Sequence, residues 1–445
     1  MSNKVAFNEN YPDISESNKL YERSKGLIPA FTQTLAKGPG QYVNGVAPKY
    51  LKRGKNARVW DVDGNEYIDL NMAIGPLSIG YSIPEIDEAI KAQLQNGITF
   101  SLMHPLEVEV AELIRDVVPN AESVRYSKTG ADVVSAAVRL ARAYTKKNKV
   151  LCCGYHGWHD WYIAVTDRNA GIPQVIEDMS FTFNYNDIQS VIDSIDEDVA
   201  CIILEPFVFQ EPKDNFLQEL RRVCDEKKIL LIFDEMWTGF RVALGGAQEY
   251  FGVNADLALF SKAVANGMPI GLLTGRQEIM NLLDKDVFFF TTFGGEALSL
   301  AATKATIEYM KENRVQEVIA QKGNRLKDGY NSIARELGIN YTSCNGFACR
   351  TIITFDAAKG NVLEMKSLVQ QEMIKRGVLW GGFHNVCYSL TEAEIDYILD
   401  CYRDVLPILK KAVEEGKVKE MLRGEAVGPV FRKTSNFNMK PKAKA

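Results

Sequence analysis

The amino-acid sequence predicts an α/β protein whose central sheet is mostly parallel. Between about residues 84 and 275, segments with helical periodicity alternate with short apolar runs. The runs are continuous rather than alternating, which is typical of strands buried on both faces by helices. The predicted helices are Pro84–Gln95, Pro105–Val118 and Ala131–Lys147, and the predicted strands are Val150–Cys153, Ala200–Leu204, Ile229–Phe233, Leu257–Phe260 and Gly271–Thr274. Ligands of such sheets bind beyond the carboxyl ends of the strands, so the residues that follow each run are the candidates for function.

The segments before and after this region predict a second, smaller α+β domain. Residues 1–40 are expected to form an arm with a short helix at Ser17–Ser24, and alternation around Asp63-Gly64-Asn65 predicts a β-hairpin. Two long helical segments, Glu296–Asn313 and Val315–Leu337, lead into the rest of this domain, which ends near Val413. The predicted division is 1–72 for the arm and part of the small domain, 73–325 for the large domain, and 326–445 for the C-terminal small domain. Residues 431–445 carry five basic and no acidic side chains, which favours a solvated tail over a binding arm.

Composition excludes several classes of protein. The chain has 445 residues, 52 basic and 57 acidic side chains, and 46% hydrophobic residues, as expected of a globular enzyme and not of a disordered or nucleic-acid-coating protein. Its eight cysteines form no C-x-x-C pair, which favours a reducing compartment over a zinc ribbon or a disulfide framework. No apolar run reaches the roughly 18 residues of a membrane span, and the N-terminus lacks an apolar signal segment. We therefore expect a cytoplasmic protein with no membrane or nucleic-acid partner.

Two predicted strands are followed directly by charged residues. Ile229–Phe233 runs into Asp234 and Glu235, and a carboxylate at a buried strand end needs a cation or a hydrogen bond. Leu257–Phe260 runs into Ser261 and Lys262 among small apolar residues, where a desolvated amine becomes a nucleophile able to form a Schiff base. Taken singly, a turn-capping aspartate and a lysine that extends to solvent explain both features.

Other strand ends carry candidate binding groups. Thr129-Gly130-Ala131 opens a predicted helix, whose free N–H groups suit a phosphate, although a plain helix cap is an equal explanation. Tyr155 and His156 follow Val150–Cys153, and we expect the aromatic ring to support a flat ligand. His156 and His159 have no third ligand nearby, so no metal site is predicted. The remaining candidates are Glu205 after Ala200–Leu204 and Thr292 in the glycine-containing segment 288–296.

Together these groups are those that pyridoxal 5′-phosphate (PLP) requires: an amine, a carboxylate for the ring nitrogen, an aromatic plate and a phosphate site. The motifs Thr-Gly-Ala-Asp, Gly-Tyr-His-Gly, Glu-Pro, Phe-Asp-Glu-Met, Ser-Lys and Thr-Thr-Phe-Gly-Gly also occur in the order of a known family. Over about residues 58–400 the chain resembles the class III aminotransferases of PLP fold type I, and is most similar to their glutamate-1-semialdehyde 2,1-aminomutase branch.

This resemblance implies a fold and a set of roles. The fold is a large domain with a mostly parallel, seven-stranded sheet between helices, and a smaller α+β domain built from both ends of the chain. Lys262 forms the internal aldimine and shuttles a proton, and Asp234 pairs with the ring nitrogen. The cofactor-binding set also includes Tyr155 and Met236 on the two ring faces, Gly130 and Ala131 at the phosphate, Thr292 reaching the phosphate from a partner subunit of a homodimer, and Thr129, His156 and Glu205.

The chain departs from the family pattern mainly on the substrate side. Lys128-Thr-Gly-Ala-Asp replaces Asn-Ser-Gly-Thr-Glu, so Lys128 either adds charge at the phosphate or points to solvent. Ser261 replaces a glycine, Gly294-Gly295-Glu296 replaces Ser-Gly-Asn/His, and Ile74 replaces the tryptophan of the aminomutases. Lys128, Arg142 and Arg241 are candidate contacts for an anionic substrate. We expect an aminotransferase that moves nitrogen from a donor, glutamate by family habit, to a keto or aldehyde acceptor such as a sugar-type carbonyl. The alternative is an intramolecular aminomutase.

Overall fold

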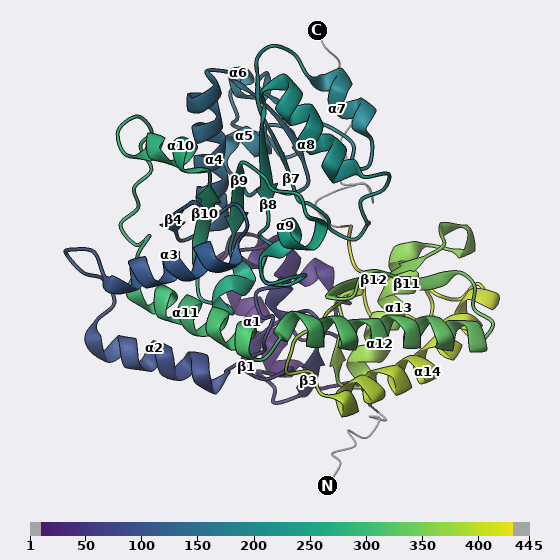
Figure 1. Cartoon of the computed structure of the whole chain (residues 1–445). Coiled ribbons are helices and arrows are strands. Elements are labelled where there is room, and N and C mark those ends of the chain that lie inside the picture. The colour runs from purple at the N-terminus through teal and green to yellow at the C-terminus, as the bar shows by residue number, and fades with distance from the viewer. Residues whose placement is uncertain (1–9, 430–445) are drawn as a thin grey trace. The chain divides into compact units, whose positions relative to one another are not determined.

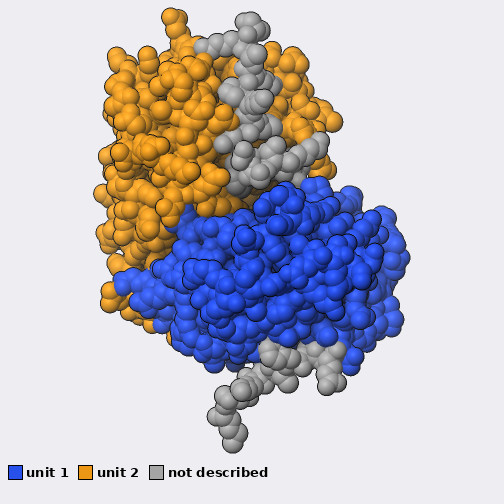
Figure 2. Space-filling model, turned by 90° about the vertical axis from the view of Figure 1, so that its right-hand side faces the viewer, with its two compact units in different colours: residues 1–83, 317–433 blue, residues 84–316, 434–445 orange. Residues whose placement is uncertain are grey.

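The computed structural model describes residues 10–429, and these form two compact units. One unit contains residues 84–316, and the other contains the described residues up to 83 and from 317 onward (Figure 2). The boundaries predicted from the sequence, after residues 72 and 325, stay a prediction. The predicted basic tail at 431–445 lies outside the described residues.

The unit of residues 84–316 is built on a seven-stranded sheet of order β4-β10-β9-β8-β7-β5-β6. Its strands are β4 (Ser123–Ser127), β5 (Lys149–Cys153), β6 (Ser180–Thr182), β7 (Val199–Leu204), β8 (Leu230–Asp234), β9 (Leu257–Phe260) and β10 (Gly271–Gly275). Only β10 runs antiparallel to its neighbours in this sheet, so the predicted mostly parallel α/β fold is confirmed. β4 and β6 are not among the strands predicted from the sequence.

Helices cover both faces of this sheet, and Figure 1 shows α4 on one side of the strands and α7 and α8 on the other. The helices of this unit are α2 (Pro84–Asn96), α3 (Pro105–Val117), α4 (Gly130–Thr145), α5 (Asp160–Ile163), α6 (Gln174–Glu177), α7 (Ile188–Ser194), α8 (Phe216–Lys227), α9 (Gly246–Phe251), α10 (Gln277–Met280) and α11 (Ala297–Glu312). The apolar face of α4, with Val133, Ala137 and Leu140, packs on alternate strand residues such as Ile203 and Ile232. All six residues of β7 are buried, as a continuous apolar run predicts.

The other unit contains two smaller sheets, of orders β1-β2-β3-β13 and β11-β12-β14. Its strands are β1 (Leu51–Lys55), β2 (Arg58–Asp61), β3 (Glu66–Asp69), β11 (Thr342–Phe347), β12 (Arg350–Phe355), β13 (Val378–Leu379) and β14 (Phe383–Asn385). Its helices are α1 (Ser15–Ser24), α12 (Val315–Glu336, which begins at the boundary), α13 (Val362–Lys375) and α14 (Glu392–Glu414). The predicted hairpin is present as β2 and β3, with Gly64 at a φ of 93° in its turn. No helix among the described residues is long and apolar enough to cross a membrane.

Candidate active site

The carboxyl ends of neighbouring parallel strands meet at one edge of the seven-stranded sheet. Leu204 of β7 pairs with Cys153 of β5 and with Phe233 of β8, and Asp234 of β8 pairs with Leu259 of β9. The strands therefore end level with one another. The polar residues predicted to follow them lie along this single edge, where ligands of parallel sheets bind.

Lys262 follows β9 after one residue and begins a short 3₁₀ turn, Lys262–Ala265. Its φ is 48°, a left-handed conformation that side-chain-bearing residues seldom adopt. The next three residues of the turn are buried, and the Ser261 hydroxyl donates to the carbonyl of Ile270 at 2.6 Å. The replacement of glycine by Ser261 therefore adds a bond that holds the base of Lys262 to the strand beside it.

Asp234 is 1% exposed and bonded through both carboxylate oxygens. Its Oδ1 accepts from the backbone N–H of Met236 at 3.1 Å, and its Oδ2 lies 2.7 Å from Nδ1 of His156. The other ring nitrogen of His156, Nε2, lies 3.1 Å from the carbonyl of Cys153. Both ring nitrogens of His156 therefore have polar partners, one a carboxylate and the other a backbone carbonyl. His156 thus orients the carboxylate and compensates its burial.

The N-terminus of α4 lies at the same edge because β4 ends beside the start of β10. Thr129 caps the helix in a capping box, accepting from the backbone N–H of Asp132 at 3.2 Å. Packing around the first turn leaves no room for larger residues. A Cβ on Gly130 would lie 2.9 Å from Sδ of Met236, and one on Gly271 would lie 2.5 Å from the carbonyl oxygen of Thr129. The N–H groups of this turn carry the positive end of the helix dipole.

Tyr155 is held by its backbone, and the residue is 46% exposed. Its N–H donates to Oε2 of Glu205 at 2.9 Å, and its ring meets the edge of Tyr162 at 5.6 Å. The preceding Gly154 has a φ of 115°, and a Cβ there would lie 2.7 Å from the Glu205 carboxylate. Glu205 therefore fixes the loop that carries Tyr155, a role that the sequence did not specify.

These groups fit pyridoxal 5′-phosphate. The amine suits the aldehyde of the cofactor, and the buried carboxylate with a fixed orientation suits its ring nitrogen. The exposed aromatic ring suits the ring face, and the helix N-terminus suits the phosphate. The tight packing of Gly130 against Met236 brings the helix N-terminus beside a residue that lies two positions after Asp234. Among residues 10–429, no group of three or more His, Cys, Asp and Glu side chains is placed to bind a metal ion.

Comparison of the sequence with known proteins agrees with this chemistry. Residues 42–401 match the family model described as aminotransferase class-III. The chain belongs to the class-III aminotransferases. This aminotransferase is 35% identical to the 3-aminobutyryl-CoA aminotransferase of Cloacimonas acidaminovorans, over 89% of this chain and 98% of that protein. It is 39% identical to the glutamate-1-semialdehyde 2,1-aminomutase of Acetivibrio thermocellus, over 72% of this chain and 80% of that protein.

Solved structures agree on the fold and the cofactor. The PLP internal aldimine form of the Sphingopyxis sp. MTA144 FumI protein matches with a TM-score of 0.83 and 27% identity, covering 89% of this chain and 97% of that chain. A structure described as a transaminase with PLP bound matches with a TM-score of 0.82 and 26% identity, covering 91% and 100%. The protein is therefore a PLP-dependent aminotransferase of fold type I.

The surroundings of Lys128 agree with neither of the two roles expected from the sequence, a charge at the phosphate or a side chain that points to solvent. Its ammonium donates to Oε1 of Glu296 at 2.6 Å, to the carbonyl of Pro269 at 3.1 Å and to the hydroxyl of Ser299 at 3.1 Å. All three N–H groups are used, so Lys128 neither adds charge at a phosphate nor points to solvent. Glu296 in turn caps α11 through the N–H groups of Leu298 and Ser299. The pair ties the end of β4 to the start of α11.

The remaining candidate residues lie in different surroundings. Thr292 is exposed in the segment between Phe288 and Glu296. Arg241 is fully buried, with its guanidinium 4.8 Å from the Trp237 ring centre, so it is not the surface residue that arginines usually are. Arg142 donates through Nε to the carbonyl of Asn148. His159 bonds to Ser135 at 2.6 Å while His156 bonds to Asp234, so the two histidines serve separate partners.

Glu235 has a structural role that the sequence does not predict. It is fully buried beside Asp234 and accepts from the backbone N–H groups of Ala247 at 2.8 Å and Gln248 at 3.0 Å, as well as from the Thr238 hydroxyl. Burial raises the pKa of its carboxyl to about 7, against the hydrogen bonds, which lower it. The adjacent carboxylates therefore have different functions, because Asp234 faces the site edge and Glu235 anchors the start of α9.

Proposed function

We propose that this aminotransferase moves an amino group between two separate molecules. Glutamate is the proposed donor and a keto or aldehyde compound, such as a sugar-type carbonyl, the proposed acceptor. This proposal rests on the positions of Asp234, the last residue of β8, and Lys262, which comes just after the adjacent parallel strand β9, at one edge of the sheet. The match to an aminotransferase over 98% of that protein's length supports transfer between molecules, and its name adds 3-amino acyl thioesters to the candidate donors.

The chain's residues divide the work as follows. Bound PLP supplies an electron sink that stabilises negative charge on the reacting carbon. In the proposed mechanism the Lys262 amine binds the cofactor and then moves a proton at the substrate carbon. Asp234, held by His156, keeps the ring nitrogen protonated. Tyr155 and Met236 enclose the ring, and the N–H groups of Gly130 and Ala131 bind the phosphate.

A second candidate is an intramolecular aminomutase, favoured by the 39% identity to a glutamate-1-semialdehyde 2,1-aminomutase. It uses the same residues at the sheet edge. Against it stand the altered substrate-side residues, among them Ile74 in place of tryptophan and Glu296, whose carboxylate is bonded to Lys128.

The two functions are separated by an absorbance experiment on the PLP-loaded protein. Addition of excess glutamate is expected to bleach the yellow band and release one 2-oxoglutarate per active site. A band that bleaches without release of a free oxo acid supports the aminomutase. A band that glutamate leaves unchanged refutes glutamate as the donor, and a 3-amino acid is then the next donor to test.

We also propose a homodimer in which Thr292 reaches the partner's phosphate site. Large apolar side chains are exposed on one region of this unit, which we call the apolar patch: Leu94, Ile98, Phe100, Leu102, Met103, Val108, Phe288, Phe290 and Phe293. Its two segments are adjacent, because the N–H of Ala297 donates to the carbonyl of Ile98 at 2.9 Å, and a Cβ on Gly295 would lie 2.8 Å from Glu107. Soluble monomers seldom expose apolar patches of this kind. We therefore propose that a second copy of the chain covers the apolar patch.

The dimer is tested by light scattering on Met103→Glu, a substitution at a side chain that is 82% exposed. A buried interface carboxylate is expected to shift the protein to monomer and to weaken PLP binding. Val175→Glu is the matched control, since Val175 is 58% exposed outside the patch. A monomeric wild type, or an unchanged mass for the Met103 variant, contradicts the proposal. A cytoplasmic location is proposed as well, supported by eight cysteines that are all free and buried.

A further inference from the structure

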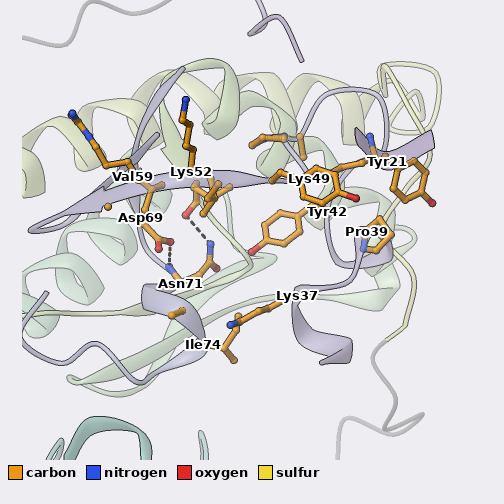
Figure 3. A pocket seen from close by; sticks show the side chains of 18 of the residues that line it. Tyr21, Lys37, Pro39, Tyr42, Lys49, Lys52, Val59, Asp69, Asn71 and Ile74 are labelled. Atoms are coloured by element: carbon orange, nitrogen blue, oxygen red, sulfur yellow. Dashed lines mark hydrogen bonds between the residues drawn. The ribbon is translucent and has the colours of Figure 1, made fainter. Parts of the chain in front are cut away.

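Each unit of the structure contains a cavity large enough for a small molecule. The cavity in the unit with the N-terminal segment has a volume of about 440 Å³, and its lining includes the substrate-side residue Ile74 (Figure 3). The cavity in the unit of residues 84–316 has a volume of about 400 Å³ and is lined by residues of α4, α5 and α6 (Figure 1). We call it the α4 pocket. None of its described lining residues belongs to the set at the edge of the seven-stranded sheet.

The α4 pocket combines an apolar lining with positive charge. Its apolar side chains include Val138 of α4, Trp161 of α5, Ile176 of α6 and Met179. Its charged side chains are those of Arg139, Arg142 and Asp160. The two arginines are three residues apart on α4, so they share one face of the helix. The three charges sum to one positive charge, which a single negative charge on a ligand balances.

The two arginines of the α4 pocket make no ion pair with a carboxylate among residues 10–429. Arg139 donates to the carbonyl of Phe288 at 2.9 Å, and Arg142 donates to the carbonyl of Asn148 at 2.8 Å. A guanidinium has five N–H donors, so both side chains keep donors for a further acceptor. Arg142 is half-buried, and burial lowers the pKa of its guanidinium against the charge of Asp198. A bound anion would compensate this burial.

Trp158 gives the α4 pocket an open aromatic face. The residue is 69% exposed, whereas the other four tryptophans of the chain are buried or half-buried. Its ring meets the ring of His159 edge-on, with 4.7 Å between the ring centres. An exposed indole gains free energy when a flat apolar group covers it. The indole and the guanidinium groups together therefore suit a ligand with an apolar ring at one end and an anion at the other.

The lining of the α4 pocket is connected to the carboxylate proposed for the cofactor. The Ser135 hydroxyl lies 2.6 Å from Nδ1 of His159 and accepts from the indole N–H of Trp161 at 3.1 Å. The Trp161 ring stacks on the ring of His156, with 6.1 Å between centres and 18° between planes. His156 in turn contacts Asp234 at 2.7 Å. A ligand that moves Trp161 therefore acts on the pair of His156 and Asp234 through packed side chains.

We propose that the α4 pocket binds a flat apolar monocarboxylate, and that its occupancy changes the surroundings of the cofactor ring. Arg139 and Arg142 hold the carboxylate, and Trp158 packs against the ring of the ligand. The binding site is independent of the amino donor and acceptor. Its effect on the cofactor rests on the proposed function, in which Asp234 holds the ring nitrogen.

The test is calorimetric titration of the PLP-loaded protein with 2-naphthoate, which has no amine, ketone or aldehyde to react. Wild type is expected to bind it, and to bind the uncharged 2-naphthalenemethanol about tenfold more weakly or worse. Arg139→Gln is expected to weaken 2-naphthoate binding about tenfold, the usual effect of one charge-assisted hydrogen bond. Trp158→Ala is expected to weaken it several-fold. Both residues are exposed, and Arg335→Gln is the matched control, an exposed arginine of α12 outside the pocket.

The visible absorbance of bound PLP reports the effect on the cofactor. The yellow band of wild type is expected to shift as 2-naphthoate saturates the protein, and Arg139→Gln should need about tenfold more ligand for the same shift. Binding without any shift overturns the link to the cofactor.

Three results overturn the site itself. They are no binding to wild type, as expected if a second copy of the chain covers the pocket, equal binding by wild type and Arg139→Gln, and an equal loss in Arg335→Gln. No amino donor is present in the titration, so failure of the proposed donor and failure of this pocket give different results.

Discussion

Replacing Glu235 by Gln is expected to change how the stability of this aminotransferase depends on pH. Glu235 is fully buried, and burial raises the pKa of its carboxyl from its ordinary 4.5 to about 7 in the folded protein. The folded chain therefore binds the proton more tightly than the unfolded chain does. The stability that this proton contributes is fully present below about pH 4.5 and is lost as the pH rises through about 7.

The size of the effect follows from the two pKa values. The difference between a pKa of about 7 in the folded protein and 4.5 in the unfolded chain corresponds to about 3 kcal/mol of unfolding free energy. Most of this free energy, about 2 to 3 kcal/mol, is lost between about pH 5 and about pH 8. Glutamine keeps one carbonyl oxygen for the N–H groups of Ala247 and Gln248 and does not titrate. The free energy of unfolding of wild type should therefore fall by that amount relative to Glu235→Gln over this range.

The assay is urea unfolding followed by circular dichroism across that pH range, for both proteins. Glu226→Gln removes the same charge from an exposed position of α8 and controls for the change in net charge. Parallel stability curves for wild type and Glu235→Gln would refute the reasoning. A difference of the opposite sign would show that hydrogen bonding to Glu235 outweighs its burial.

Three further substitutions have expected outcomes. His156→Phe removes the donor to Asp234, so PLP affinity in a titration of the apoprotein should fall about tenfold or more, and an unchanged affinity contradicts the pairing. Gly271→Ala places a Cβ 2.5 Å from the Thr129 carbonyl oxygen, and a loss of about 1–3 kcal/mol in urea unfolding is expected, whereas wild-type stability contradicts the packing. Lys128→Met should lower stability by about 1–3 kcal/mol and leave PLP affinity unchanged, and a selective loss of PLP affinity would restore the phosphate role.

Matched controls separate these effects from general ones. Gly40→Ala adds a Cβ with nothing within 4 Å, so it reports the effect of the methyl group alone. Lys55→Met removes an exposed lysine of β1 and reports the effect of losing one positive charge.

The sequence predicts the sheet edge well because strand burial and strand-end polarity are local signals. Continuous apolar runs mark β7, β8 and β9. Asp234 comes directly after one of these runs, and Lys262 comes one residue after another. Parallel strands bring their carboxyl ends together, so the order of the runs was enough to expect these residues on one edge.

The strand β4 and the roles of Lys128 and Glu235 could not be predicted in the same way. β4 is Ser-Val-Arg-Tyr-Ser, with four of its five residues only partly buried, so it has no apolar run to reveal it. Glu296 is far from Lys128 in the sequence, and their ion pair depends on how β4 and α11 pack. The bonds of Glu235 to the start of α9 likewise depend on the fold.

The left-handed turn at Met72–Ile74 was also out of reach, because its residue types disfavour it. Propensity predicts glycine or asparagine at positive φ, and only Gly75 at the end of the turn agrees with that expectation. Tertiary contacts, among them the bond between Asn385 Nδ2 and the carbonyl of Asn71 at 2.8 Å, impose this conformation.

The central claim is that Lys262 is the residue that binds the cofactor covalently. Borohydride reduction of the PLP-loaded protein, followed by peptide mass spectrometry, tests it most directly, because reduction fixes PLP to the lysine that holds it. We expect the phosphopyridoxyl group on the peptide that contains Lys262, and we expect no such label in Lys262→Ala treated in the same way. Label on a different lysine of the wild type, or a wild type that retains PLP without a reducible bond, would contradict it.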